Sequence, residues 1–235
     1  MNISVIMAAL NAERYLSEAL LSIARQSLQP NEVILVDGGS QDETLRIAAR
    51  HPNIRLIAQS GTGLADAWNT GVRQAQGDTL AFLDCDDIWS PEKLAQQIAV
   101  FKNTPAIDAV VGHVKFFLSA GQKRPSTFKP GLLNGTYPAP MPGALLIRRK
   151  AFEQVGWFDE RFKIAPDIDW FARLRDLKLT IITLPEVLIH KRVHQTNLSL
   201  ATASQSDYQT ELLRLLFEKR QRNRGSLKSA QILTS

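Results

Sequence analysis

The sequence has 235 residues, 44% of them apolar, which is enough to bury one full hydrophobic core. Its 28 basic and 23 acidic residues give a formal charge of +5, and its single cysteine excludes an intrachain disulfide and a multi-cysteine zinc site. The opening residues lack a signal-peptide pattern, and no apolar run reaches the roughly 18 to 20 residues that a membrane-spanning helix needs. We therefore expect a globular, cytoplasmic protein.

The first hundred residues alternate short β-branched runs with amphipathic segments of helical length. The expected strands are 3–8, 32–37, 54–58 and 79–84, and the expected helices are 12–26, 40–51, 64–75 and 91–101. We expect Ser40 to cap the second helix, with Glu43 as its capping-box partner. The alternation predicts βαβ units, and therefore an α/β fold with a mainly parallel central sheet flanked by helices.

Beyond residue 105 the alternation changes. A longer strand at 108–119 precedes a segment rich in glycine, proline, serine and threonine at 119–142, and a loop of that length is usually functional or mobile. The remaining expected elements are strands at 143–149, 179–184 and 187–193, helices at 150–158 and 167–177, and one terminal helix at 205–224.

Acidic side chains stand at the ends of two expected strands. Asp37 ends "VILVD", while Asp84 ends "AFLD" and is followed by Cys85, Asp86 and Asp87. The carboxyl ends of parallel strands meet at one sheet edge, where ligands bind in α/β proteins. Asp84 and Asp86 can face the same ligand, and Mg²⁺ or Mn²⁺ is commonly bound by one or two carboxylates together with substrate phosphates. The stretch indicates half of a metal site, although Asp87 is also typical of a turn and Cys85 of the core.

Five stretches in a fixed order carry a resemblance to a known family. They are "SVIMAALNAERYLSEALLSIARQSLQPNEVILVDGGSQDET", "GLADAWNTGVRQAQGDTLAFLDCDD", "GALLIRRKAFEQVGWFDERF", "DIDWFARL" and "RVHQTNLS". Together they resemble the family 2 glycosyltransferases of GT-A fold, of the bacterial type that builds surface polysaccharides. The resemblance implies a GT-A-like domain at 1–204, with a nucleotide-binding half at 1–104 and an acceptor half at 105–204, then a C-terminal helix and tail at 205–235.

The resemblance implies roles for four acids. Asp37 would accept from the base of a nucleotide, most often uracil, and Asp84 would contact the ribose or the metal. Asp86 would coordinate the metal that bridges the donor diphosphate, and Asp66 would lie beside the nucleotide. The plainer interpretations are a strand-end turn for Asp37 and helix capping for Asp66.

The chain departs from the family pattern in two places. The usual Pro-Thr-Tyr-Asn after the first strand is replaced by residues 8–11, "AALN", which leaves only a backbone contact to the nucleotide at Ala9. The acid pair before the acceptor-side helix has become Pro166 and Asp167. The family pattern makes Asp167 the general base, with Asp169 as the second choice; both would otherwise be ordinary first-turn acids of a helix.

Histidine and tryptophan side chains offer further candidates. His190 and His194 are four residues apart in a strand-like run, which would place them on one face. The resemblance puts His194 near the diphosphate or on the metal, with Arg192 close by, although a lone histidine is more often structural. Trp157 and Trp170 could stack on acceptor sugar rings, and we favour the core for Trp170.

The resemblance predicts an inverting glycosyltransferase that moves a sugar from a nucleoside diphosphate sugar, UDP-linked, to a hydroxyl of a glycan or lipid-linked glycan. Mn²⁺ or Mg²⁺ would be the cofactor. The alternative is a non-catalytic GT-A module that binds a nucleotide or glycan. A nicotinamide-dependent oxidoreductase is disfavoured because no Gly-x-Gly-x-x-Gly follows the first strand.

The expected terminal helix combines leucines with a basic end. We predict that it packs on its own domain, lies on anionic lipid at the inner face of the membrane, or joins a second subunit in a homodimer. No nucleic acid partner is expected.

Overall fold

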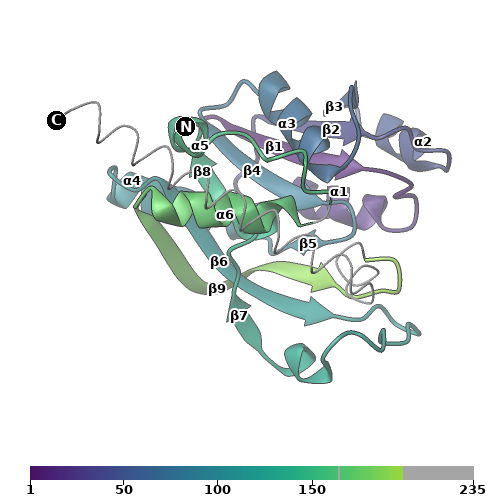
Figure 1. The fold of residues 1–235 in the computed structure, drawn as a ribbon. Coiled ribbons are helices and arrows are strands. Elements are labelled where there is room, and N and C mark those ends of the chain that lie inside the picture. Colours follow the sequence, from purple (N-terminus) through teal and green to yellow (C-terminus); the bar gives the residue numbers. More distant parts are fainter. Residues whose placement is uncertain (164, 198–235) are drawn as a thin grey trace, which may run out of the picture.

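The β-branched and apolar runs of the sequence form a central sheet, and helices cover both of its faces (Figure 1). The computed structural model describes residues 1–163 and 165–197. The strands are β1 (Ile3–Ala9), β2 (Glu32–Asp37), β3 (Ile54–Ala58), β4 (Thr79–Asp84), β5 (Ile88–Trp89), β6 (Ala109–Phe117), β7 (Thr136–Pro138), β8 (Leu146–Arg148) and β9 (Ile181–Arg192). The α-helices are α1 (Leu16–Ala24), α2 (Thr44–Ala49), α3 (Leu64–Gln74), α4 (Lys93–Asn103), α5 (Arg149–Val155) and α6 (Pro166–Asp176), and the 3-10 helices are η1 (Pro130–Asn134) and η2 (Pro142–Ala144).

The strands of the described residues are ordered β3-β2-β1-β4-β8-β6-β9-β5, and β7 pairs with β6. The strands β3, β2, β1 and β4 are parallel to one another. Because β8 is antiparallel to both β4 and β6, and β9 is parallel to β6, the strands β6 and β9 again point the same way as β4. The predicted α/β class is confirmed, with antiparallel pairs added by β5, β7 and β8.

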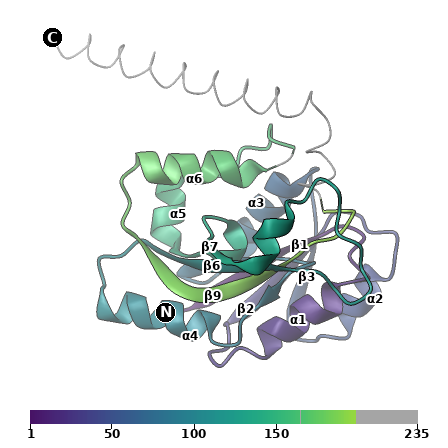
Figure 2. The same cartoon turned by 90° about the horizontal axis from the view of Figure 1, so that it is seen from below.

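The helices form two outer layers (Figure 2). Leu20 of α1 and Leu94 of α4 belong to the core on one face of the sheet, together with residues of α2. Trp68 of α3 and Trp170 of α6 belong to the core on the other face, together with residues of α5. The parallel strands are buried on both faces, which explains their nearly continuous apolar sequences.

The two strands expected at 179–184 and 187–193 are one strand, β9. It runs through Pro185, which offers no N–H for a sheet hydrogen bond. The pairing of β6 with β9 shifts register between Val111 and His113, where β9 advances from Thr183 to Val187. This irregularity accommodates the proline, so the break read from the sequence is a bulge inside a strand.

The segment 119–142 is partly structured. It contains η1 and β7, and Tyr137 of β7 pairs with Val114 of β6. The strand expected at 143–149 is correspondingly shorter, because η2 includes its first residues and β8 begins only at Leu146. The proline and glycine residues of this segment indicated its irregular backbone, but no local pattern predicted the short strand β7.

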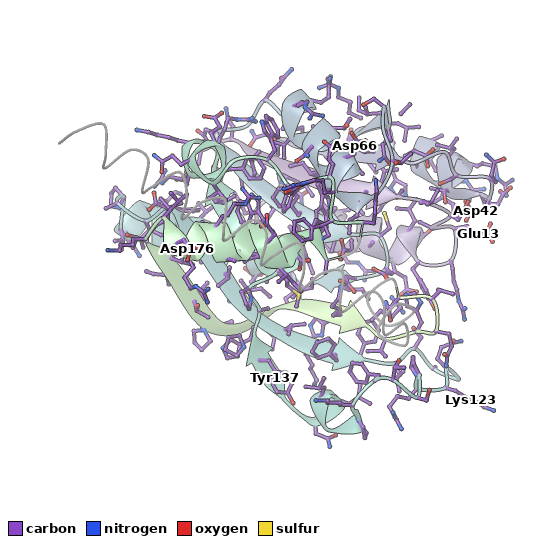
Figure 3. The ribbon with its side chains drawn as sticks, viewed as in Figure 1. Glu13, Asp42, Asp66, Lys123, Tyr137 and Asp176 are labelled. Atoms are coloured by element: carbon purple, nitrogen blue, oxygen red, sulfur yellow. The ribbon has the colours of Figure 1, made fainter. Side chains whose placement is uncertain are left out.

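The capping box predicted at Ser40 and Glu43 is wrong. The helix α2 begins one residue after Glu43 and has no side-chain cap. Ser40 instead accepts the backbone N–H of Asn11 (2.9 Å), and Asp42 accepts that of Glu13 (3.0 Å), which lies next to it (Figure 3). The residues after β2 therefore bind the loop after β1, and these tertiary partners replace the local cap.

No helix in residues 1–163 and 165–197 is long and apolar enough to cross a membrane. The terminal helix expected at 205–224, the tail to residue 235 and the predicted domain boundary at residue 204 lie outside the described residues.

Candidate active site

The carboxyl ends of β2 and β4 lie on either side of β1. Asp37 is in register with Ala9, and Asp84 is in register with Ala8. Because adjacent strands are about 4.8 Å apart, the Cα atoms of the two acids are separated by about 10 Å. Ala9 is buried, and its carbonyl accepts the N–H of Gly38 (2.8 Å), which fixes the turn after Asp37.

The two oxygens of Asp37 have different surroundings. Its Oδ2 accepts the N–H groups of Gly39 (3.0 Å) and Ser40 (3.1 Å), as the strand-end turn interpretation requires. Its Oδ1 is buried and has no hydrogen-bond partner among the described residues. Such an oxygen is costly unless it accepts a hydrogen bond, so Asp37 can hold the turn and still accept from a ligand.

Asp66 is buried in the first turn of α3 (Figure 3). Its Oδ2 accepts the N–H of Gly61 (3.0 Å), in the loop that precedes the helix. A Cβ at Gly61 would lie 2.7 Å from the carboxyl carbon of Asp66, so this contact requires glycine. The cap residue of α3 is Gly63, and Asp66 therefore fastens the loop after β3 to the first turn of α3.

Asp84, Asp86 and Asp87 form an acid cluster after β4. One oxygen from each lies within 4.8 Å of the others, a spacing that could hold a divalent cation. The cluster also contains the ammonium of Lys191, which lies 2.7 Å from Oδ2 of Asp87 and 3.3 Å from Oδ2 of Asp84. Arg192 donates its backbone N–H to the other oxygen of Asp87 (2.9 Å).

Asp86 is bound by residues that follow β9. Its Oδ2 lies 2.9 Å from Nε2 of His194 and accepts a hydrogen bond from the amide of Asn197 (3.1 Å). The other ring nitrogen of His194, Nδ1, lies 2.9 Å from the hydroxyl of Thr196. His194 therefore contacts the cluster through Asp86, and metal binding by His194 stays a prediction.

The pKa values of the acid cluster diverge. Burial raises the pKa of Asp87 to about 7, although the Lys191 ammonium acts in the opposite direction. Burial also raises the pKa of Asp84, and Lys191 again opposes it. For Asp86 the effect of burial is outweighed by the hydrogen bond from His194 and the charge of Lys191, so its pKa is lowered. Asp86 is thus the member of the cluster that ionises most readily.

Asp167 lies in the first turn of α6, next to Pro166 at the helix start. The residue that precedes this turn, Ala165, has a left-handed backbone conformation with φ of 50°. Burial raises the pKa of Asp167, the negative charge of Asp84 raises it further, and Lys191 opposes both effects. The charges of Asp84 and Lys191 therefore both affect the Asp167 carboxyl.

Asp169 is buried on another side of α6. Its Oδ2 accepts a hydrogen bond from Nε of Arg173 (2.9 Å), one helical turn away. The carboxylate therefore belongs to an ion pair within the helix. The other candidate base, Asp167, has its pKa raised by the charge of Asp84 in the acid cluster.

The two tryptophan candidates differ in exposure. Trp170 is fully buried and donates its N–H to the carbonyl of Gly156 (2.8 Å), as the core interpretation predicted. Trp157 is 48% exposed and lines a hollow of about 530 Å³ together with Asn69 and Arg73. An acceptor contact at Trp157 stays a prediction.

The two histidines of the strand-like run have unrelated partners. His190 lies in β9, with Nε2 3.2 Å from the hydroxyl of Ser90. The strand ends at Arg192, so His194 lies beyond it and contacts Asp86. The expectation that the two rings share one face of a strand is therefore wrong.

The sequence analysis did not identify Lys191 or Asn197 as site residues, and it expected Arg192 near the diphosphate. The guanidinium of Arg192 is buried and donates to Glu18 (2.9 Å) and to the backbone carbonyl of Asp86 (2.9 Å). It therefore holds the backbone of the acid cluster and does not contact the cluster's carboxylates through its side chain. A lysine inside a largely apolar strand was the one signal that could have identified Lys191.

Comparisons with known proteins identify relatives of this chain. The family model described as "Glycosyl transferase family 2" matches residues 4–156. An uncharacterized glycosyltransferase of Nostoc sp., alr2836, is 31% identical over 229 residues, covering 89% of this chain and 70% of its own length. A PGL/p-HBAD biosynthesis glycosyltransferase of Mycobacterium tuberculosis is 34% identical, with 72% of this chain and 68% of its own length covered.

Solved structures share the fold. Staphylococcus aureus TarS 1-349 in complex with UDP-GlcNAc has a TM-score of 0.70 at 24% identity, covering 92% of this chain and 65% of TarS 1-349. The mannosyltransferase PcManGT of Pyrobaculum calidifontis, in complex with GDP-Man and Mn²⁺, has a TM-score of 0.66 at 23% identity, covering 94% of this chain and 64% of its own. The chain thus spans less than two thirds of either solved chain. Together with the family model and the Nostoc relative, these matches show that the chain belongs to glycosyltransferase family 2 and has a GT-A-like fold.

Proposed function

We propose that the protein is an inverting glycosyltransferase that moves a sugar from a nucleoside diphosphate sugar, UDP-linked, to a hydroxyl of a glycan or lipid-linked glycan. Asp167 is the general base, and Ala9, Asp37, Asp66 and Asp84 bind the nucleotide. The observation that supports the proposal is the cluster of Asp84, Asp86 and Asp87 at the carboxyl end of β4, where the charge of Asp84 also raises the pKa of Asp167.

The donor side is supported by the surroundings of Asp37. Its buried Oδ1 accepts no hydrogen bond from any described residue, and an N–H of a nucleotide base can supply one. UDP and UDP-GlcNAc are bound in the TarS structures, and GDP-Man is bound in PcManGT. The resemblance to family members favours uracil as the base for this chain.

The acid cluster fits a divalent metal, because hard cations prefer carboxylate oxygens. Asp86 and Asp84 would hold the ion, and His194, which lies next to Asp86, would be a further ligand. When bound, Mn²⁺ or Mg²⁺ supplies Lewis-acid stabilisation to the departing diphosphate. PcManGT, which has the same fold, was solved with Mn²⁺.

The reaction is a single displacement. The acceptor oxygen bonds to the anomeric carbon while the bond from that carbon to the diphosphate oxygen breaks, and the electron pair leaves with the diphosphate. The proton of the acceptor hydroxyl passes to the carboxylate of Asp167. Burial raises the pKa of Asp167 towards the range in which a general base is effective, and one displacement inverts the anomeric configuration.

The test of the proposal compares Asp167→Asn with Asp169→Asn. Release of the nucleoside diphosphate is assayed with a panel of nucleotide sugars and acceptors, and donor binding is followed by thermal shift with and without Mn²⁺. We expect Asp167→Asn to lose about 10² to 10⁴ in kcat while donor binding persists. Asp169→Asn, which weakens an ion pair within α6, should keep kcat within about tenfold.

Two outcomes count against the proposal. Turnover that survives Asp167→Asn moves the base elsewhere. Stabilisation by nucleotide sugars without turnover on any acceptor favours the alternative, a non-catalytic GT-A module, which the loss of the first family acid at Pro166 makes reasonable.

Asp37→Asn gives a separate prediction about the donor. An amide has one acceptor oxygen, so it can hold the turn at Gly39 and Ser40 or accept from the base, but not both. We expect the donor KM to rise about tenfold and kcat to change little, because the contact binds donor and transition state alike. The matched control is Asp42→Asn in the loop before α2, and equal KM values in both variants would contradict the prediction.

The acceptor side leads to a proposal about location. A lipid-linked acceptor would bring the protein to the inner face of the membrane, with residues 205–235 as the predicted contact or dimer segment. Co-sedimentation with anionic liposomes, with and without residues 205–235, tests the membrane contact, and light scattering tests the homodimer. Equal sedimentation of both forms would exclude the segment as the lipid contact.

A further inference from the structure

Lys191 places a positive charge inside the acid cluster. Its Nζ lies 2.7 Å from Oδ2 of Asp87 and 3.3 Å from Oδ2 of Asp84. These two carboxylates are also two of the three that could hold a divalent cation. The ammonium and a metal ion would therefore compete for the same residues, and like charges at such distances repel each other strongly.

The strand β9 holds the lysine in place. Lys191 is in register with Phe116 of β6, and the next residue, Arg192, donates its backbone N–H to Asp87. Asp87 is fully buried, so its pairing with Lys191 is a fixed part of the fold. The contact to Asp84 is longer and its side chain is 32% exposed, which makes Asp84 the carboxylate that can exchange Lys191 for another cation.

A donor brings its own negative charge. The two phosphates of a nucleoside diphosphate sugar would give the ammonium of Lys191 a new anionic partner at the sheet edge. Asp84 would then be available to a metal, together with Asp86. The diphosphate oxygens would complete the ligand set, as is common for Mg²⁺ sites.

We propose that Lys191 is a positioning residue that weakens divalent-metal binding to the donor-free site and couples metal binding to arrival of the donor diphosphate. The inference rests on the proposed function. Because coupling between two ligands is reciprocal, Mn²⁺ strengthens nucleotide binding by the same factor by which the nucleotide strengthens Mn²⁺ binding.

Mn²⁺ binding tests the inference without any turnover. The full chain, Lys191→Met and Lys191→Arg are titrated with Mn²⁺ alone, with UDP and with GDP, and the free ion is followed by electron paramagnetic resonance. We expect the full chain and Lys191→Arg to bind Mn²⁺ at least about tenfold more tightly with the matching nucleotide. Lys191→Met should bind Mn²⁺ alone at least about tenfold more tightly than the full chain and gain less from nucleotide.

A second variant keeps the test valid if the first one unfolds. Lys191→Met leaves the buried Asp87 charge without its partner, which is destabilising. The double variant Asp87→Asn with Lys191→Met removes both charges and keeps Asp84 and Asp86. Circular dichroism establishes that each variant is folded, and a lysine with only a structural role would not increase Mn²⁺ affinity when removed.

The possible failures are distinguishable. Equal affinity for Mn²⁺ alone in the full chain and in both Met variants, with tighter binding when nucleotide is added, overturns the inference and leaves the proposed function standing. Failure of every variant to bind Mn²⁺, with UDP, with GDP or with neither, overturns the metal-assisted function and the inference together.

Discussion

Lys93 is fully buried, and within the described residues its ammonium donates to the side chain of Gln97 (2.8 Å) and the carbonyl of Leu145 (3.2 Å), neither of which is a carboxylate. Its ammonium also lies 4.2 Å from the ring centroid of Trp89. Gln97 and Trp89 bind the two preceding carbonyls, those of Ala144 and Gly143, so three side chains fix the short turn η2 against α4. Burial lowers the pKa of Lys93 well below its ordinary value.

Lys93→Met therefore changes how stability depends on pH. Between the lowered folded pKa and the unfolded value of 10.5, the unfolded chain binds one more proton, so the free energy of unfolding rises with pH. The slope is at most about 1.4 kcal/mol per pH unit. Lys93→Met lacks this contribution. The free energy of unfolding of the parent chain should therefore increase relative to that of the variant as the pH rises from about 7 towards 10.5.

Urea denaturation at several pH values measures this difference. Lys102→Met is the matched control, because Lys102 is an exposed lysine of the same helix, and its profile should run parallel to that of the parent chain. A parallel profile for Lys93→Met would show that Lys93 titrates normally.

Single residues of the site were predictable where local sequence set their position. Asp37 and Asp84 end strands that alternate with helices, so their meeting at one edge followed from the fold class. Lys191 and Asn197 contact acids that lie more than 100 positions earlier in the chain. A local sequence pattern cannot predict which side chains meet over such a separation.

At the scale of elements, α3 packs tightly against the sheet at Gly71. A Cβ at this position would lie 2.4 Å from Cγ2 of Ile6 in β1, and the side chain of Ile6 is fully buried. The glycine therefore sets the distance between helix and sheet, although glycine weakens a helix interior by about 1 kcal/mol relative to alanine.

Gly71→Ala should lower the free energy of unfolding by about 1 to 3 kcal/mol, because the added methyl group overpacks the contact. The double variant with Ile6→Ala should be more stable than the sum of the two single changes by about 1 kcal/mol or more, since the smaller side chain removes the overlap. Chemical denaturation of all four proteins measures this coupling.

Gly131→Ala is the control for this cycle, because a Cβ there meets no atom within 4 Å, and its effect should stay within about 0.5 kcal/mol. Strictly additive effects of Gly71→Ala and Ile6→Ala would contradict the proposed contact.

Elements were predicted best where packing and local pattern agree. The strands at 32–37, 54–58 and 79–84 have the expected bounds, because their apolar runs are short and end in turn residues. We expected a break near Pro185 because proline cannot donate a hydrogen bond within a sheet. The irregular pairing of β6 with β9 accommodates the proline, so the strand continues. The cap expected at Ser40 failed for a similar reason, since a loop distant in sequence supplied its partner.

On the scale of the whole molecule, Arg192 connects parts of the chain that are far apart. Its guanidinium binds Glu18 of α1, the carbonyl of Asp86 after β4 and the hydroxyl of Ser119 after β6. It also lies 4.5 Å from the ring centroid of Tyr15. One buried side chain thus joins the helix α1 to the end of β9.

Arg192→Lys should lower the free energy of unfolding by about 2 to 4 kcal/mol, because an ammonium cannot reach three partners that a planar guanidinium binds together. Arg14→Lys is the control: Arg14 is exposed and also lies near the ring of Tyr15 (5.1 Å), and its effect should stay within about 0.5 kcal/mol. Equal losses in the two variants, measured by urea denaturation, would show that Arg192 has no special role.

The distance along the chain between Lys191 and its partners has a consequence for how the protein is made. Asp84 precedes Lys191 by 107 positions and Asp87 precedes it by 104, so on the ribosome these acids emerge long before their counter-charge. Until β9 is added, the nascent sheet carries neighbouring carboxylates that repel one another. The acid cluster therefore receives its counter-charge only once the last described strand, β9, has been synthesised.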